Sequence, residues 1–251
     1  MDNITKAKIN LFAVLRNIQD LCAMDPVAQE IIKNQKISVQ FNVPKVGNAT
    51  LKFVEGKCAF IRGKAKANLK LSFTSPEHFN KLVDGEKTIP IFINIFKAGF
   101  LLDTFTKLAA RLSYFLKPTS ELLADPEYFK INTYLTAYTA FFALCEIGNS
   151  DRIGKLIASR IPQGDIQLRV VEGPEMVINI DETHSMSVRK GAIDEPRALM
   201  QFSNLQTASD ILNGKTDIYS CLGAGKFLIK GFLPMLDNMS KLLAFVSKYL
   251  A

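Results

Sequence analysis

Apolar and polar residues alternate along several short stretches of the chain. Every second residue is apolar from 37 to 43, from 69 to 73 and from 166 to 170. A period of two is the period of a β-strand with one apolar face, because successive side chains point to opposite sides of a sheet. These stretches therefore predict mainly antiparallel sheets in which one face is buried and the other faces water.

The same series of segments occurs twice, in the same order. The second occurrence follows the first by 122 residues at the start of the series and by 129 residues at its end, as differences in loop length would produce. A repeat of this length predicts a tandem duplication, with residues 1–122 as the first unit and 123–251 as the second. The matching segments are KIN (8–10 and 130–132), LC (21–22 and 144–145), VQFNV with IQLRV (39–43 and 166–170), CAFIRGKA with MSVRKGAI (58–65 and 186–193), and LSFTSPEHFNKLVDGEKT with MQFSNLQTASDILNGKTD (71–88 and 200–217).

Each unit is predicted to be of the α+β class, with a five-stranded, mainly antiparallel sheet covered on one face by helices. The expected order is a long helix, a short helix, four strands, a short helix that ends at Gly85 or Gly214, a fifth strand and a long amphipathic helix. Glycine suits the left-handed backbone at the end of a helix. The predicted ranges are 4–23 and 127–146 for the first helix, starts near Pro26 and Ser150 for the second, and 100–116 and 232–249 for the last.

The segment GAGK at 223–226 poses the question of a phosphate-binding loop. The motif GxxxxGK[ST] would need a glycine at Ser220 and a hydroxyl at Phe227, and the sequence has neither. The segment GKFLIKG at 225–231 is instead predicted to be the fifth strand of the second unit, with Phe227 and Ile229 on one face.

This strand, the capped segment ILNGKTD at 211–217 before it and the amphipathic helix behind it resemble the sterol carrier protein (sterol transfer) family. The resemblance covers nearly the whole chain, once per repeat, and is strongest over 166–250. The first copy departs from the pattern after Gly85, because TIPIFINIFKAGF (88–100) has no GKxxIKG frame and Pro90 interrupts its apolar run. Whether this copy forms the same fifth strand or runs early into a long helix stays open.

The resemblance implies an apolar tunnel between sheet and helices that takes fatty acyl chains, acyl-CoA, sterols or phospholipids. It also implies a carrier without catalytic activity or cofactor, although the family occurs as an accessory domain of enzymes as well. The alternative is that the same side chains simply fill a core, and the chain is then a structural or interaction module. The residues expected to line the tunnel are Ile211, Leu212, Phe227, Ile229, Phe232, Met235 and Leu236 in the second copy, and Phe79, Leu82, Phe92, Phe96, Phe100 and Leu101 in the first.

The net charge of +7 lies entirely in the first half of the chain. Residues 1–125 contain 18 Lys and Arg against 11 Asp and Glu, whereas residues 126–251 contain 13 of each. A basic set on the third and fourth strands of the first copy is either a solvated face or a contact for anionic lipid headgroups. Nucleic acid is not expected, because the sequence shows no docking element or stacking platform. The basic set is Lys57, Arg62, Lys64, Lys66 and Lys70.

Metal binding, secretion and catalysis find little support in the sequence. The most apolar stretch, 89–102, is too short to span a bilayer, and the first 15 residues do not resemble a signal peptide. No GxSxG motif occurs, and the cluster DETHS at 181–185 is predicted to be a turn. We expect a cytoplasmic protein with reduced thiols, because the cysteines are scattered without metal-ligand spacing. They are Cys22, Cys58, Cys145 and Cys221, and the two histidines are His78 and His184.

Overall fold

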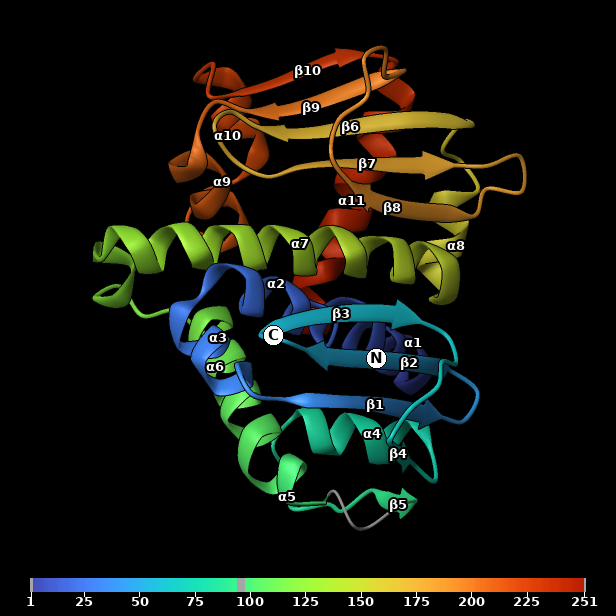
Figure 1. Ribbon diagram of the computed structural model, residues 1–251. Helices are drawn as coiled ribbons and strands as arrows, with labels where there is room; N and C mark the ends of the chain where they lie inside the picture. The colour runs from blue at the N-terminus through green and yellow to red at the C-terminus, as the bar shows by residue number, and fades with distance from the viewer. Residues whose placement is uncertain (1, 94–97, 251) are drawn as a thin grey trace. The chain divides into compact units, whose positions relative to one another are not determined.

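The computed structural model describes residues 2–93 and 98–250 of the chain (Figure 1). It divides into two compact units, Met1–Leu135 and Thr136–Ala251. This division falls inside the helix α7 (Pro126–Ser150), whose first residues pack in the first unit. The sequence-based boundary between residues 122 and 123 marks where the repeated segments begin again, and it stays a prediction.

The first unit holds the first copy of the predicted elements. The first predicted helix is divided into α1 (Asn3–Ile9), a π-helical turn (Asn10–Val14) and α2 (Asn17–Met24), and α3 (Pro26–Ile32) follows it. The strands are β1 (Lys36–Val43), β2 (Gly47–Val54), β3 (Lys57–Arg62), β4 (Leu69–Ser72) and β5 (Ile91–Ile93). The other helices are α4 (Pro76–Val83), α5 (Ala98–Phe100), a π-helical segment η3 (Leu101–Phe105), α6 (Thr106–Leu116) and a short 3-10 turn (Leu122–Ala124).

The second unit repeats this order after α7. Its strands are β6 (Gly164–Val170), β7 (Glu175–Ile180), β8 (Met186–Lys190), β9 (Ala198–Phe202) and β10 (Phe227–Gly231). Its further helices are α8 (Arg152–Ala158), α9 (Leu205–Leu212), α10 (Ile218–Gly223) and α11 (Leu233–Leu250). The short helix α10 has no counterpart in the predicted scheme.

The two sheets have the same topology, which confirms the predicted fold class. Their strand orders are β3-β2-β1-β4-β5 and β8-β7-β6-β9-β10, and Figure 1 shows both. Each strand of the first sheet therefore occupies the position of its repeat in the second. The central pairs β1/β4 and β6/β9 are parallel and the remaining pairs are antiparallel, so each sheet is mixed.

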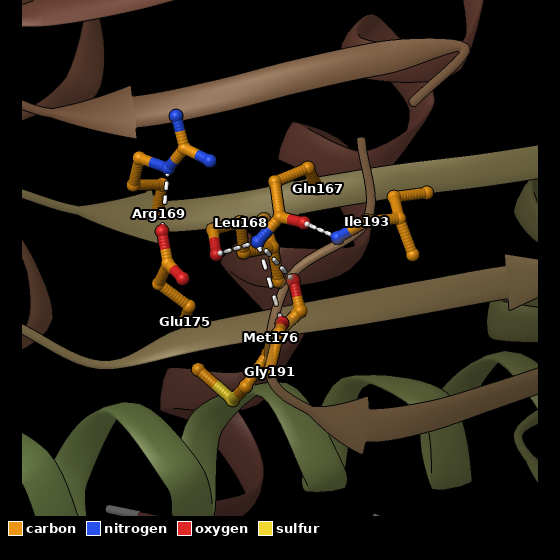
Figure 2. A network of polar contacts seen from close by, with 7 residues as sticks. All are labelled: Gln167, Leu168, Arg169, Glu175, Met176, Gly191 and Ile193. Carbon is orange, nitrogen blue, oxygen red and sulfur yellow. Dashed lines mark hydrogen bonds and ion pairs between the residues drawn. The ribbon is translucent and has the colours of Figure 1, made fainter. Parts of the chain in front are cut away.

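The parallel central pair requires a connection that crosses the sheet. The chain passes from β3 to β4 through residues 63–68, and from β8 to β9 through residues 191–197, over the face that the alternation predicts to be wet. Gln167 points to this face from β6 and is fully buried, because the crossing segment covers it (Figure 2). The expectation of one wet face is therefore wrong at the centre of the sheet.

The buried Gln167 joins the crossing segment to the sheet by hydrogen bonds. Its Nε2 donates to the carbonyl oxygens of Leu168 at 3.0 Å, Met176 at 3.3 Å and Gly191 at 3.5 Å (Figure 2). Its Oε1 accepts from the backbone N–H of Ile193 at 3.0 Å. A buried amide of this kind is stable only with such partners.

The short helix after the fourth strand begins and ends as the sequence predicts. The Ser75 hydroxyl accepts from the N–H of His78, and Asn204 Oδ1 accepts from the N–H of Thr207. Beyond the helix ends, Gly85 has φ 84° and Gly214 has φ 70°. These are left-handed conformations that favour glycine.

The open question about the fifth strand of the first copy is settled for the described residues. β5 pairs antiparallel with β4, with Phe92 opposite Leu71 and Ile91 opposite Ser72. The strand is short, and Pro90 lies just before it. Phe96, one of the predicted tunnel residues, lies outside the described residues.

Candidate ligand-binding region

The buried members of the predicted lining set pack into the cores of the two units. In the first unit Phe100 contacts Phe53 of β2, with ring centroids 5.3 Å apart. Tilted aromatic pairs at this distance leave no room for another molecule between the rings. Side chains thus occupy the space between sheet and helices at these positions. The buried members are Phe79, Phe100, Leu101, Phe227, Met235 and Leu236.

The two units fill equivalent space with different residues. In the first unit, Phe79 of α4 packs on Phe73 with centroids 4.9 Å apart. The position equivalent to Phe79 is Ala208, and there Phe227 of β10 packs on Phe202, also at 4.9 Å. A phenylalanine from the helix thus packs on Phe73 in one unit, and a phenylalanine from the edge strand packs on the equivalent Phe202 in the other.

A second group of predicted residues is only half-buried and lies at the edge of each core. Leu82 and Phe92 pack against the core of the first unit from outside. Ile211 and Ile229 occupy the equivalent positions in the second unit and are also half-buried, as is Leu212. We call these five residues the apolar rim. Phe232 is more exposed, at 39%.

The backbone of β10 places the rim of the second unit. The strand pairs with β9, which α9 also contacts, so β10 and α9 both border β9. Gly225 precedes β10 and Gly231 is its last residue, with φ 68° and 93°, and a Cβ at Gly231 would collide with the carbonyl oxygen of Arg197. The glycines of the GKFLIKG frame are thus required by backbone geometry.

Large apolar side chains are also exposed next to the rim in both units. Ile91 on β5 and Leu228 on β10 are 52% and 48% exposed, and both lie on the outer face of an edge strand. Leu233, at the start of α11, and Leu102, in η3, are exposed as well. The edge strand and the start of the last helix therefore expose apolar surface in each unit.

The hollows that the structure shows in the first unit lie elsewhere. One of about 350 Å³ is lined by the start of α3, the end of α6 and the start of α7. Another, of about 450 Å³, lies on α3 beside Pro26, Val27, Glu30 and Ile31. Neither includes a predicted tunnel residue.

An ion pair between a buried aspartate and a half-buried arginine forms one wall of the 350 Å³ hollow. The Arg111 guanidinium donates from Nε and Nη2 to the two carboxylate oxygens of Asp25, each at 2.8 Å, and stacks on Tyr114 and Phe115. The hydrogen bond to Asp25 raises the pKa of Arg111, and burial raises the pKa of Tyr128 to about 12. Asp25 also caps α3, so the pair ties α3 to α6. Sequence analysis missed this pair because its members lie 86 residues apart without a motif.

The structure separates the predicted basic set. Lys57 and Lys70 lie on the outer face of the first sheet, whereas Arg62 lies on the core side, with its guanidinium 3.8 Å from the centre of the Phe12 ring. Lys64 and Lys66 lie in the crossing segment, so their placement on strands is wrong. All five are exposed.

The DETHS cluster forms the turn between β7 and β8, as predicted. Asp181 accepts hydrogen bonds from the side chain and backbone of Thr183 and from the N–H of Ser185. The hydrogen bond from the Thr183 side chain is the main cause that lowers the pKa of Asp181. Such bonds stabilise a turn.

All four cysteines are free thiols, and Cys58 is close to Cys22. A hydrogen bond between these two thiols, together with burial, raises the pKa of Cys58 far above that of an ordinary thiol. Within residues 2–93 and 98–250, no group of three or more His, Cys, Asp or Glu side chains is placed to hold a metal ion. No helix in the described part of the chain is long and apolar enough to cross a membrane.

Known proteins were compared with the chain by sequence and by structure. Neither a protein-family model nor a curated protein matches it. Among solved structures, domain 2 of a sterol carrier protein from Helicoverpa armigera is 18% identical, with a TM-score of 0.35, over 49% of this chain and 93% of that one.

Two further sterol carrier proteins are similar to the chain. Palmitated SCP2L2 from Aedes aegypti is 17% identical, with a TM-score of 0.31, over 39% of this chain and 83% of that one. Sterol Carrier Protein 2 from Yarrowia lipolytica, in its apo form, is 12% identical, with a TM-score of 0.32, over 41% and 92%. Solved structures of the family that the sequence resembles are thus among those found, and each likeness is distant and covers less than half of the chain.

Proposed function

We propose that the chain is a binding protein for apolar ligands with an acyl-chain or sterol body, and that it carries out no catalysis. The ligand enters a unit at the apolar rim, between the edge strand and the end of the short helix before it. The observation that carries this proposal is the equivalence of Leu82 with Ile211 and of Phe92 with Ile229, because both pairs are half-buried.

Half-buried side chains at a core edge mark the place where an apolar ligand displaces the least packing. Phe92 and Ile229 lie on the core-facing side of their strands, yet water still reaches them. A ligand that covers them gains the free energy of removing apolar surface from water, about 25 cal/mol per Å². The resemblance of GKFLIKG to sterol carrier proteins supports this class of ligand.

The buried members of the predicted set then act as the inner wall that an inserting chain displaces. Met235 and Leu236 form one such wall on α11, and Met239, which is outside the predicted set, is buried on the same helix. Methionine is unbranched and adapts its shape to a new neighbour at low cost. An acyl chain that passes Ile229 would therefore meet side chains that can rearrange.

A structural or interaction module is the second candidate, and a separate observation favours it. The tilted ring pairs of Phe53 with Phe100 and of Phe202 with Phe227 occupy space between sheet and helices, where a tunnel would run. If these ring contacts do not separate, both units have packed cores with no space for a ligand.

Uptake of a fluorescent fatty acid by the delipidated full chain distinguishes the two candidates. We expect the unmodified chain to bind the probe and Ile229→Glu to lose binding while its circular dichroism spectrum stays unchanged. The fold survives because Ile229 is half-buried and a carboxylate there can reach water.

Leu228→Glu is the matched control, since Leu228 is the neighbouring residue on the opposite face of β10. It should bind the probe like the unmodified chain. Absence of binding by the unmodified chain would leave the structural module as the function. Unchanged binding by Ile229→Glu would show that the ligand does not use this rim.

We also propose that the protein works in a reducing compartment such as the cytoplasm. Its four cysteines are free thiols, and Cys58 lies within hydrogen-bonding reach of Cys22 without a disulfide. Oxidising compartments favour disulfides between such neighbours.

A further inference from the structure

Lysine side chains gather on the outer face of the first sheet, the face opposite its core. Strand register places Lys36, Lys52, Lys57 and Lys70 on this face. Side chains at even positions of β1, such as Ser38 and Gln40, point to it, and each of the four lysines either occupies such a position or aligns with one across the paired strands. The segment that crosses this face adds two more. We call the set the lysine face; it comprises Lys36, Lys52, Lys57, Lys64, Lys66 and Lys70, all exposed.

The lysine face carries no compensating charge on its strands. None of its outward-facing strand positions between 36 and 72 is Asp or Glu, and the closest carboxylate along the chain is Glu55 in the turn between β2 and β3. Among the described residues, none of its six ammonium groups takes part in an ion pair. Six unpaired positive charges on one sheet face create a strong local potential.

The equivalent face of the second sheet is different. There Arg169 pairs with Glu175, and Asp165 lies on the same strand as Arg169. The excess charge is therefore a property of the first unit alone, although both sheets have the same topology.

We propose that the first unit docks on an anionic lipid bilayer through the lysine face. Lysine ammonium groups attract a diffuse anionic surface without the fork geometry by which arginine recognises individual phosphates. Ile61 and Ile91 are exposed on the same outer face and supply apolar contacts for the interfacial region. No Phe, Tyr or Trp occupies an outward position of its described strands, so it offers no platform on which nucleic-acid bases would stack.

The proposal does not depend on ligand uptake. The lysine face lies on the opposite side of the sheet from the core-facing rim residue Phe92. Docking and ligand binding can therefore fail separately, and each has its own assay.

Cosedimentation of the full chain with vesicles tests the docking surface. We expect binding to vesicles that contain phosphatidylserine, no binding to pure phosphatidylcholine, and weakening as salt shortens the screening length. Reversal of Lys52, Lys57 and Lys70 to Glu should weaken binding by at least about a hundredfold, since each lysine near the surface contributes about a fivefold factor.

Reversal of Lys33, Lys107 and Lys117 to Glu is the matched control, because it changes the net charge equally at exposed positions outside the sheet. This control should weaken binding by less than about tenfold. Equal losses in the two triple variants would overturn the proposal, as would equal binding to neutral vesicles. Retention on heparin without binding to vesicles would also overturn it, in favour of an acidic polymer as partner. The fatty-acid assay without vesicles should give the same uptake for both triple variants.

Discussion

Gln40 and Gln167 occupy the same position in the two sheets but differ in the hydrogen bonds that their side-chain amides make. Gln167 Nε2 donates to three carbonyl oxygens, and its Oε1 accepts from the N–H of Ile193. Gln40 is only 6% exposed, and its Nε2 is buried without a hydrogen-bond partner. The segment that crosses the first sheet, 63–68, is one residue shorter than its counterpart 191–197, which supplies hydrogen-bond partners to Gln167. Replacement of each glutamine by methionine, which has a similar length and no polar atoms to satisfy, tests what these bonds contribute.

The expected effects differ in sign. Gln167→Met leaves the Ile193 N–H without its acceptor and removes the donor to Gly191, so we expect the free energy of unfolding to fall by about 1–3 kcal/mol. Gln40→Met removes a buried donor that has no partner, and it should leave stability unchanged or raise it by up to about 1 kcal/mol. The change in side-chain volume is nearly the same in both variants, which makes each the control for the other.

Urea unfolding of the full chain, followed by circular dichroism, measures both changes. Hydrogen exchange of peptides from 191–197 adds a local measurement, because loss of the Gln167 bonds should raise exchange there. Equal destabilisation by the two substitutions would refute the reasoning, and so would a larger loss for Gln40→Met. Either result would mean that the hydrogen bonds of Gln40 contribute at least as much to stability as those of Gln167.

Two further predictions follow from packing and ionisation. Phe79→Ala should lower the free energy of unfolding by about 3–5 kcal/mol, because it leaves a cavity in a packed core. At the equivalent position, Ala208→Phe should lower it by about 1–3 kcal/mol, because Phe227 already fills that space. Adding Phe227→Ala to Ala208→Phe should recover part of this loss, and urea unfolding measures all three variants. The raised pKa of Tyr128 favours the protonated phenol in the folded state, so its contribution to stability is complete below pH 10 and is lost as pH rises through about 12. Phenolate absorbance should include a step in that range, and Tyr128→Phe should remove it.

Local patterns predicted a large part of the fold. Alternation identified β1 and β6, and the Gly85 and Gly214 caps marked the ends of α4 and α9, because these features depend on residues close together in the sequence. The repeat then gave equivalence between the units, and the two sheets confirm it with one strand order.

Features that depend on distant residues could not be predicted in the same way. The parallel pairing of β1 with β4 forces the crossing segment over the sheet, so Gln40 and Thr50 are buried on a face that alternation assigns to water. The ion pair of Asp25 with Arg111 joins two helices without any motif. The first predicted helix is divided by a π-helical turn at 10–14, which helical periodicity does not reveal.

The sequence predicted which apolar residues belong to the candidate region, but not which of them are packed in the core and which reach its edge. Sequence analysis gave the apolar residues of the short helix, the edge strand and the last helix as one lining set. The structure divides them into packed residues such as Phe227 and half-buried rim residues such as Ile229. Phe227 and Ile229 lie two residues apart on the same face of the edge strand β10, so the division depends on what packs against each side chain, which a one-dimensional pattern does not contain.

Native mass spectrometry of the gently purified full chain tests the proposed function most directly. The account predicts a population heavier than the bare chain by the mass of an acyl lipid or sterol, retained in Leu228→Glu and lost in Ile229→Glu. A chain that appears only at its bare mass in all three proteins, and that gains no mass when incubated with fatty acid, would contradict it.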